Sequence, residues 1–205
     1  MIRGAIVFWF IFFCNLVYAQ DPSFIEVQFI YGSKPVKKFK STEKKWFGGI
    51  LGGHVGIEDD NGKFYSFEIH GRNKVFSSKS HNSVYKIETE NEFWNAMKTT
   101  EDSIKKTTII IPVSLQQKQK FDSITAAYCK NAPYCYAVFG MRCASSTYDI
   151  LAQIGLLPRY SHFKTIMTIF YPRKLRKRLL VKAEKNKWTI IRKDGTPKRK
   201  WEKDV

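Results

Sequence analysis

Several features that would define a function are scarce or missing in this 205-residue chain. Only four histidines and four cysteines are present. None of them forms a Cys-x-x-Cys or His-x-x-x-His pair of the kind that holds zinc, so we predict no metal and no cofactor. The glycine-rich stretch 48–53 lacks the Gly-Lys-Ser/Thr ending of a phosphate loop. We find no internal repeat and no low-complexity linker, which leaves one domain as the expectation.

Long apolar runs are also missing after the first twenty residues. Arg3 precedes an apolar run from Ala5 to Cys14, and Val17-Tyr18-Ala19 offers small residues for cleavage before Gln20. A membrane anchor is the alternative, but Asn15 interrupts the run, and about 20 apolar residues are needed to span a bilayer. We predict a signal peptide over 1–19, a secreted or periplasmic location, and no transmembrane segment after cleavage.

Acidic residues are few: 18 Asp and Glu face 35 Lys and Arg, for a net charge of +17. The excess is concentrated in 173–205, where fourteen basic residues face four acidic ones. We predict that this segment is a basic C-terminal extension. It would attract an anionic surface such as lipid headgroups or cell-wall polymers, and we do not expect nucleic acid to be its partner. The alternative is a solvated tail that keeps the protein soluble.

Cysteine is odd in number once Cys14 leaves with the signal peptide. Cys129, Cys135 and Cys143 remain, and an odd count leaves one thiol unpaired in a monomer. The most local pairing is a disulfide between Cys129 and Cys135, which leaves the Cys143 thiol available. The alternative is that all three are reduced.

The remaining patterns predict an α+β fold. Strands are expected over 24–31, 54–59, 63–70, 84–88 and 107–113 from their alternating or branched apolar residues. Thr89 with Glu92 and Ser114 with Gln117 form capping boxes that open two helices. A further helix is expected from about Cys143 to Ile154. Beyond Pro158 the pattern is weaker, with an apolar patch over 166–171 and a hairpin near Asp194-Gly195.

The hairpin around 60–62 decides which polar residues meet. A three-residue loop with a left-handed Gly62 places His54 opposite Glu68, and Gly56 opposite Ser66. A two-residue Asn-Gly turn would instead place His54 opposite Ile69. We favour the longer loop because it gathers the polar residues on one face, where Glu68 is followed by His70.

Cys143 is the candidate nucleophile. The start of a helix lowers the pKa of a thiol, Arg142 adds positive charge, and the Cys143 backbone N–H offers one half of an oxyanion hole. A base must reach the sulfur and a further group must orient that base, roles that suit His54 and Glu68 with His70 in reserve. The alternatives are a buried structural cysteine, a core histidine and a solvated glutamate. A zinc site of Cys143, His54 and either Glu68 or His70 lacks paired ligands.

Three motifs together carry a resemblance. They are Gly53-His54-Val55-Gly56-Ile57, Tyr65-Ser66-Phe67-Glu68, and the later Arg142-Cys143-Ala144-Ser145-Ser146. They resemble the permuted NlpC/P60 (papain-like) cysteine hydrolases, including YiiX-like proteins and, more distantly, lecithin:retinol acyltransferase. The circular permutation places the histidine strand before the cysteine helix. The resemblance implies an antiparallel sheet packed against the helix that bears the nucleophile, with a carboxylate such as Glu68 orienting the base.

The resemblance spans about 27–157 and has departures. Ala-Ser-Ser follows the cysteine where an acidic or aromatic residue is common, and the basic extension has no counterpart. We predict a catalytic domain over 20–172 acting as a cysteine peptidase or amidase that forms an acyl-enzyme on Cys143. The substrate would be a cell-wall peptide, another amide or a lipid ester. The alternative is a non-catalytic secreted binder of anionic polymer that uses the basic segment with Trp188 and Trp201.

Overall fold

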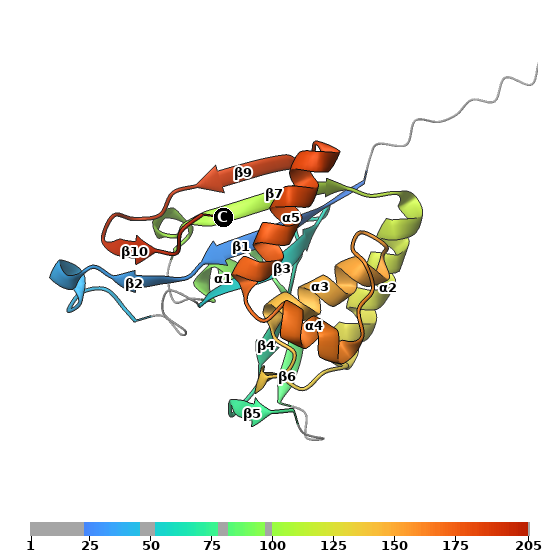
Figure 1. Cartoon of the computed structure of the whole chain (residues 1–205), viewed down its shortest axis with the longest axis horizontal. Helices are drawn as coiled ribbons and strands as arrows, with labels where there is room; N and C mark the ends of the chain where they lie inside the picture. Colours follow the sequence, from blue (N-terminus) through green and yellow to red (C-terminus); the bar gives the residue numbers. More distant parts are fainter. Residues whose placement is uncertain (1–22, 46–51, 78–81, 97–99, 205) are drawn as a thin grey trace, which may run out of the picture.

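The computed structural model describes residues 23–45, 52–77, 82–96 and 100–204 (Figure 1). The predicted signal peptide and Gly48-Gly49 lie outside the described residues. Within these ranges, no helix combines the length and apolar character needed to cross a bilayer.

An antiparallel six-stranded sheet organises the fold, in the order β6-β4-β3-β1-β7-β9. Its strands are β1 (Phe24–Tyr31), β3 (Gly53–Asp59), β4 (Phe64–Ile69), β6 (Ser83–Glu88), β7 (Lys106–Pro112) and β9 (Thr189–Lys193). Two small sheets join β2 (Ser33–Pro35) to β10 (Arg199–Trp201) and β5 (Lys74–Phe76) to β8 (Ala137–Phe139). The first five strands of the large sheet match the predicted ones to within about two residues.

The helices are α1 (Glu90–Asn95), α2 (Leu115–Lys130), α3 (Cys143–Gln153), α4 (His162–Thr168) and α5 (Pro172–Asn186). Both predicted capping boxes are present: the side chains of Thr89 and Ser114 accept from the backbone N–H three residues on, and Glu92 and Gln117 return the bond. The chain is therefore an α+β protein with a large antiparallel sheet and several helices.

Different helices pack against the two faces of the sheet. Val27, Phe29 and their alternating neighbours pack under α2, α3 and α5 in the main core, and α5 crosses over β1 and β7 in Figure 1. On the opposite face Phe64 packs with Phe93 and Trp94 of α1 in a smaller core. The period of two along each strand thus divides the side chains between two layers.

The basic C-terminal segment belongs to this packing. β9 pairs with β7 as the sixth strand, and Leu175 and Leu179 of α5 are fully buried. Arg176 is also fully buried, where its guanidinium lies 3.6 Å from the centre of the Tyr31 ring and 3.2 Å from Glu202. Parts of the segment 173–204 therefore pack with the rest of the described chain.

The hairpin expected near Asp194-Gly195 is wrong. β9 pairs with β7, and β10 pairs with β2 in another sheet. These strands were not identified from the sequence because their partners are distant in the chain.

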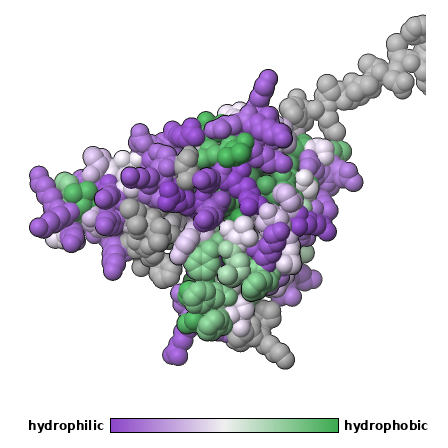
Figure 2. All heavy atoms as spheres, in the orientation of Figure 1, coloured by the Kyte–Doolittle hydropathy of each residue, from purple (hydrophilic) through white to green (hydrophobic). Residues whose placement is uncertain are grey.

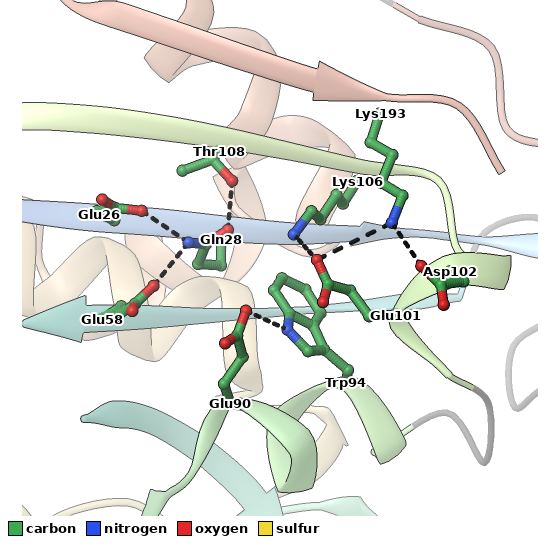
Figure 3. A network of polar contacts seen from close by, with 10 residues as sticks. All are labelled: Glu26, Gln28, Glu58, Glu90, Trp94, Glu101, Asp102, Lys106, Thr108 and Lys193. Atoms are coloured by element: carbon green, nitrogen blue, oxygen red, sulfur yellow. Dashed lines mark hydrogen bonds and ion pairs between the residues drawn. The ribbon is translucent and has the colours of Figure 1, made fainter. Parts of the chain in front are cut away.

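A polar network lies on the sheet face beside α1 (Figure 3). Gln28 donates to Glu26 and Glu58 at 2.9 and 2.8 Å, and accepts from Thr108. Burial raises the pKa of Glu58 to about 7; the Gln28 hydrogen bond opposes that shift, and Glu26 and Glu90 add to it. Glu58 is therefore protonated in the folded protein at pH values where it would be ionised in the unfolded chain.

This difference predicts how stability depends on pH. Because the pKa of Glu58 is raised by folding, the unfolded chain releases the proton first, and stability falls between about pH 4.5 and 7. Replacing Glu58 with glutamine removes that loss while keeping an acceptor for Gln28. We expect Glu58→Gln to melt at a higher temperature than the wild type at pH 8, with little difference at pH 4, as measured by circular dichroism.

Glu184→Gln, an exposed change on α5, controls for the loss of one negative charge. A Glu58→Gln protein that is less stable than the wild type at pH 8 would contradict this account.

Candidate active site

The turn between β3 and β4 fixes the register on which the site depends. Asp59 N–H donates to the carbonyl of Lys63 at 3.0 Å, and Gly62 N–H donates to the carbonyl of Asp59 at 3.1 Å. Gly62 has φ +73°, and Asp59 Oδ1 accepts from the N–H groups of Asn61 and Lys63. The predicted three-residue loop is confirmed, as is the pairing of Gly56 with Ser66.

The described ladder between β3 and β4 ends at that Gly56–Ser66 pair. One step further on the same face, Nε2 of His54 lies 3.9 Å from Oε1 of Glu68. This distance is too long for a hydrogen bond. The other oxygen of Glu68 forms an ion pair with Lys86 of β6. His54 and Glu68, which the sequence predicted to be neighbours, therefore lie side by side without a hydrogen bond between them.

Glycines on β3 make room for this arrangement. A Cβ at Gly56 would lie 2.7 Å from Cε2 of Phe93. The Phe93 ring therefore packs directly over Gly56 and reaches His54, with 5.4 Å between ring centres. Gly53 has φ +106°, and a Cβ there would lie 2.5 Å from the carbonyl oxygen of Ile30. Both positions require glycine, for different reasons.

Cys143 is the first residue of α3 and is 5% exposed. Burial raises the pKa of its thiol to about 11, although hydrogen bonds with the backbone at Val55 and Ala144, and the Arg142 charge, favour the thiolate. The helix-start contact at Ala144 and the Arg142 charge lower this pKa as expected, but desolvation is the larger effect and the net shift is upward. The contact with Val55 places the sulfur beside the residue that follows His54.

The pKa of His54 is shifted downward, whereas that of Cys143 is shifted upward. Burial lowers the pKa of its imidazole; the Glu68 carboxylate opposes that shift and Lys86 adds to it. Nε2 has no hydrogen-bond partner among the described residues. At neutral pH the thiol and the imidazole are both uncharged. The Cys143 thiolate therefore forms only when a base removes the thiol proton.

Two adjacent hollows meet at Cys143, with volumes of about 320 and 410 Å³. The first also contains His54 and Glu68, and the second contains Phe139 and Phe170. Gly53 and Tyr136 line both. The thiol therefore lies where two arms of one cleft join.

The rim of this cleft is partly apolar. Phe76 of β5 and Phe139 of β8 are 69% and 56% exposed, and their rings stack with 5.6 Å between centres. Figure 2 shows hydrophobic residues over this part of the molecule, on a face that is otherwise largely hydrophilic.

Tyr136 is a cleft residue that the sequence did not identify. Its ring stacks on Phe67, and its carbonyl accepts from Asn82 Nδ2 at 2.7 Å. The neighbouring Cys135 thiol donates to Oδ1 of the same Asn82 at 2.7 Å. The predicted Cys129–Cys135 disulfide is absent, because Cys135 is turned toward Asn82 while Cys129 lies in the last turn of α2.

The other histidines lie elsewhere. His70 follows the end of β4 and is exposed, and no contact joins its side chain to His54 in the described part of the chain. His162 is exposed and stacks on Tyr134, and His81 is outside the described residues. Glu68, not the reserve His70, is therefore the group beside the His54 ring.

A third carboxylate stands next to this pair. Glu88 of β6 is 7% exposed and accepts a hydrogen bond from Ser66. Ligand atoms of His54, Glu68 and Glu88 all lie within 4.8 Å of one another. Among the described residues, these three side chains form a group that could hold a metal ion.

Comparison with known proteins gives little. No protein-family description and no curated protein sequence matches the chain. A solved structure titled as the type VI secretion system effector TseH is similar over 83% of this chain and 99% of that chain, with 11% identity and a TM-score of 0.46. At this level the likeness shows neither a common fold nor a common activity.

The contact between Gly56 and Phe93 can be tested directly. Gly56→Ala forces the Phe93 ring away from its place against His54, and overpacking of this kind costs about 1–3 kcal/mol. We expect a lower urea midpoint and slower alkylation of Cys143. In a Phe93→Leu background the ring is gone, so adding Gly56→Ala should cost less than it does alone. Additive costs would show that the contact is unimportant.

Proposed function

We propose that this protein is an extracytoplasmic thiol hydrolase of the permuted papain-like kind. In this proposal Cys143 is the nucleophile, His54 is the general base and Glu68 orients the base. The observation that carries the proposal is that a helix-start cysteine and a histidine with a carboxylate beside it line the same hollow. Such a nucleophile, base and orienter arrangement is the signature of covalent acyl transfer.

The reaction begins from the uncharged pair. Nε2 of His54 faces Glu68, which leaves Nδ1 to take the thiol proton as the sulfur attacks the acyl carbon. A carbon–sulfur bond forms, and the imidazolium then protonates the leaving group as its bond to the acyl carbon breaks. His54 next takes a proton from water, the hydroxide attacks the thioester, and the thiol is restored as the acid product leaves.

Two backbone features assist these steps. The first N–H groups of a helix lack intrahelical partners, so the N–H of Cys143 at the start of α3 can donate to the oxyanion. Hydrogen bonds at Val55 and Ala144 already favour negative charge on the sulfur. Stabilisation is therefore available where charge develops, although the resting thiol is neutral.

The substrate follows from less direct evidence. The cleft is lined by the aromatic residues Tyr136 and Phe139 and by Gly52 and Gly53, which suits an extended chain. The resemblance favours an amide over a lipid ester, and the predicted signal peptide favours a target outside the cytoplasm, such as a cell-wall peptide.

The alternative, a binder of anionic polymer, has less support. Trp188 packs against the main core, and Trp201 donates to the carbonyl of Thr196 at 2.9 Å. Arg176 and Arg199 are buried in ion pairs with Glu202 and Glu43. Part of the basic segment therefore serves the fold, and the cleft offers the better-defined chemistry.

The test of the proposal is the dependence of Cys143 on His54. At pH 7 we expect His54→Ala to slow alkylation of Cys143 by iodoacetamide by at least about 100-fold, since a general base contributes roughly 10²–10⁴. His70→Ala, a matched change at an exposed histidine, should have no effect. Peptide-resolved mass spectrometry follows each thiol separately, with Cys129 as the internal reference.

Turnover is tested with p-nitrophenyl acetate. The wild type should release a burst of p-nitrophenolate equal to the enzyme concentration and carry an acetyl group on Cys143. Equal alkylation rates in the wild type and His54→Ala, or no acetyl adduct on Cys143, would refute the hydrolase.

The charges around His54 predict opposite shifts in its pH profile. The Glu68 carboxylate raises the pKa of His54 and Lys86 lowers it. Glu68→Gln should therefore move the acid limb of the alkylation profile to lower pH, and Lys86→Met should move it to higher pH, each by about 1 unit. Shifts in the same direction would show that the limb does not report His54.

A further inference from the structure

Three donor side chains converge on adjacent strands beside the cleft. His54, Glu68 and Glu88 come from β3, β4 and β6, and their ligand atoms lie within 4.8 Å of one another. His54 and Glu88 are 8% and 7% exposed. The donors are thus held by three adjacent strands at the β6 side of the sheet and not by a loop.

The polar atoms in this group are incompletely satisfied. Nε2 of His54 is buried, has no hydrogen-bond partner among the described residues, and faces Oε1 of Glu68 across 3.9 Å. Burial raises the pKa of Glu88; the Ser66 hydrogen bond opposes this and Glu68 adds to it. Lys86 is the cation paired with Glu68. A buried imidazole nitrogen beside two carboxylates therefore has no hydrogen-bond partner among the described residues.

We propose that His54, Glu68 and Glu88 bind a divalent transition-metal ion of the Zn²⁺ class. Imidazole nitrogen with carboxylate oxygen suits zinc, whereas Mg²⁺ and Ca²⁺ prefer oxygen ligands alone. Zinc binds such ligands at about 2.0–2.2 Å, so two donors on one tetrahedral ion lie roughly 3.4 Å apart. Small side-chain movements would bring the observed 3.9 Å between His54 and Glu68 to that distance.

Bound metal would switch off the cysteine. The ion takes the lone pair of Nε2, so the neutral imidazole carries its proton on Nδ1 and has no lone pair left for the Cys143 thiol. It also takes the Glu68 carboxylate from its orienting position. This consequence, unlike the binding itself, rests on the proposed function.

Binding is tested on the full chain by calorimetric titration with ZnCl₂ in a buffer that does not chelate metal. We expect one site in the wild type, at least about tenfold weaker binding in Glu88→Gln, and no change in Glu92→Gln. Glu92 is the matched control, because it is exposed on α1 and lines the neighbouring hollow without belonging to the group. Glu68→Gln provides a second ligand variant should Glu88→Gln unfold.

The Cys143→Ala variant distinguishes a site made of the three donors from one in which the Cys143 thiolate binds zinc. If zinc is held by the three donors, Cys143→Ala binds it as tightly as the wild type. Loss of binding in Cys143→Ala would place the ion on the thiolate and overturn the proposal, as would full-strength binding by both Glu88→Gln and Glu68→Gln.

The consequence for reactivity is read by alkylation of Cys143. Saturating ZnCl₂ should slow labelling of the wild type about as much as His54→Ala does. Zinc concentrations that silence the wild type should leave Glu88→Gln labelling at close to the zinc-free rate of that same variant. If zinc binds but the alkylation of Cys143 is not slowed, the metal site is supported and the role of His54 as the base is contradicted. If labelling of Cys143 depends on His54 but zinc does not bind, the proposed hydrolase function is supported and the metal site is refuted.

Discussion

The candidate site depends on the register of one hairpin. Asp59 accepts from both Asn61 and Lys63, and Gly62 adopts a left-handed conformation, so the loop holds three residues and no fewer. A slip of one residue in β4 would turn Glu68 to the other face of the sheet. The imidazole of His54 would then lie opposite an apolar side chain. The local hydrogen bonds of one turn therefore decide whether base and carboxylate can meet.

Burial, more than charge, sets the character of the site. The thiol of Cys143 has helix-start and backbone contacts that favour its thiolate, and still its pKa is raised to about 11. The pKa of His54 is lowered by burial against the effect of Glu68. Both shifts favour uncharged forms, because burial penalises each ion more than its neighbours stabilise it. The resting state is therefore a neutral pair.

Local signals in the sequence predicted what local contacts determine. The two capping boxes, the turn at Gly62 and the start of α3 depend on residues within a few positions of each other, and each is confirmed. The pairing of β9 with β7 joins segments that are distant in the chain, and the long-range contact of Arg176 with Tyr31 gave no pattern to recognise. Tyr136, Lys86 and Glu88 were missed for the same reason. For Cys143 the sequence indicated the charge and the helix start that lower its pKa, but not the burial that outweighs them.

The gap between His54 and Glu68 follows from the neutral resting state. Glu68 uses one oxygen for Lys86 and leaves the other 3.9 Å from a buried nitrogen. A neutral imidazole attracts a carboxylate weakly, whereas an imidazolium at that distance in a poorly solvated cleft attracts it strongly. Proton transfer from Cys143 would therefore draw Oε1 to hydrogen-bonding distance as the reaction begins. A dication in the same gap would draw it in beforehand, so the carboxylate that stabilises the working base is also the one that a metal would recruit.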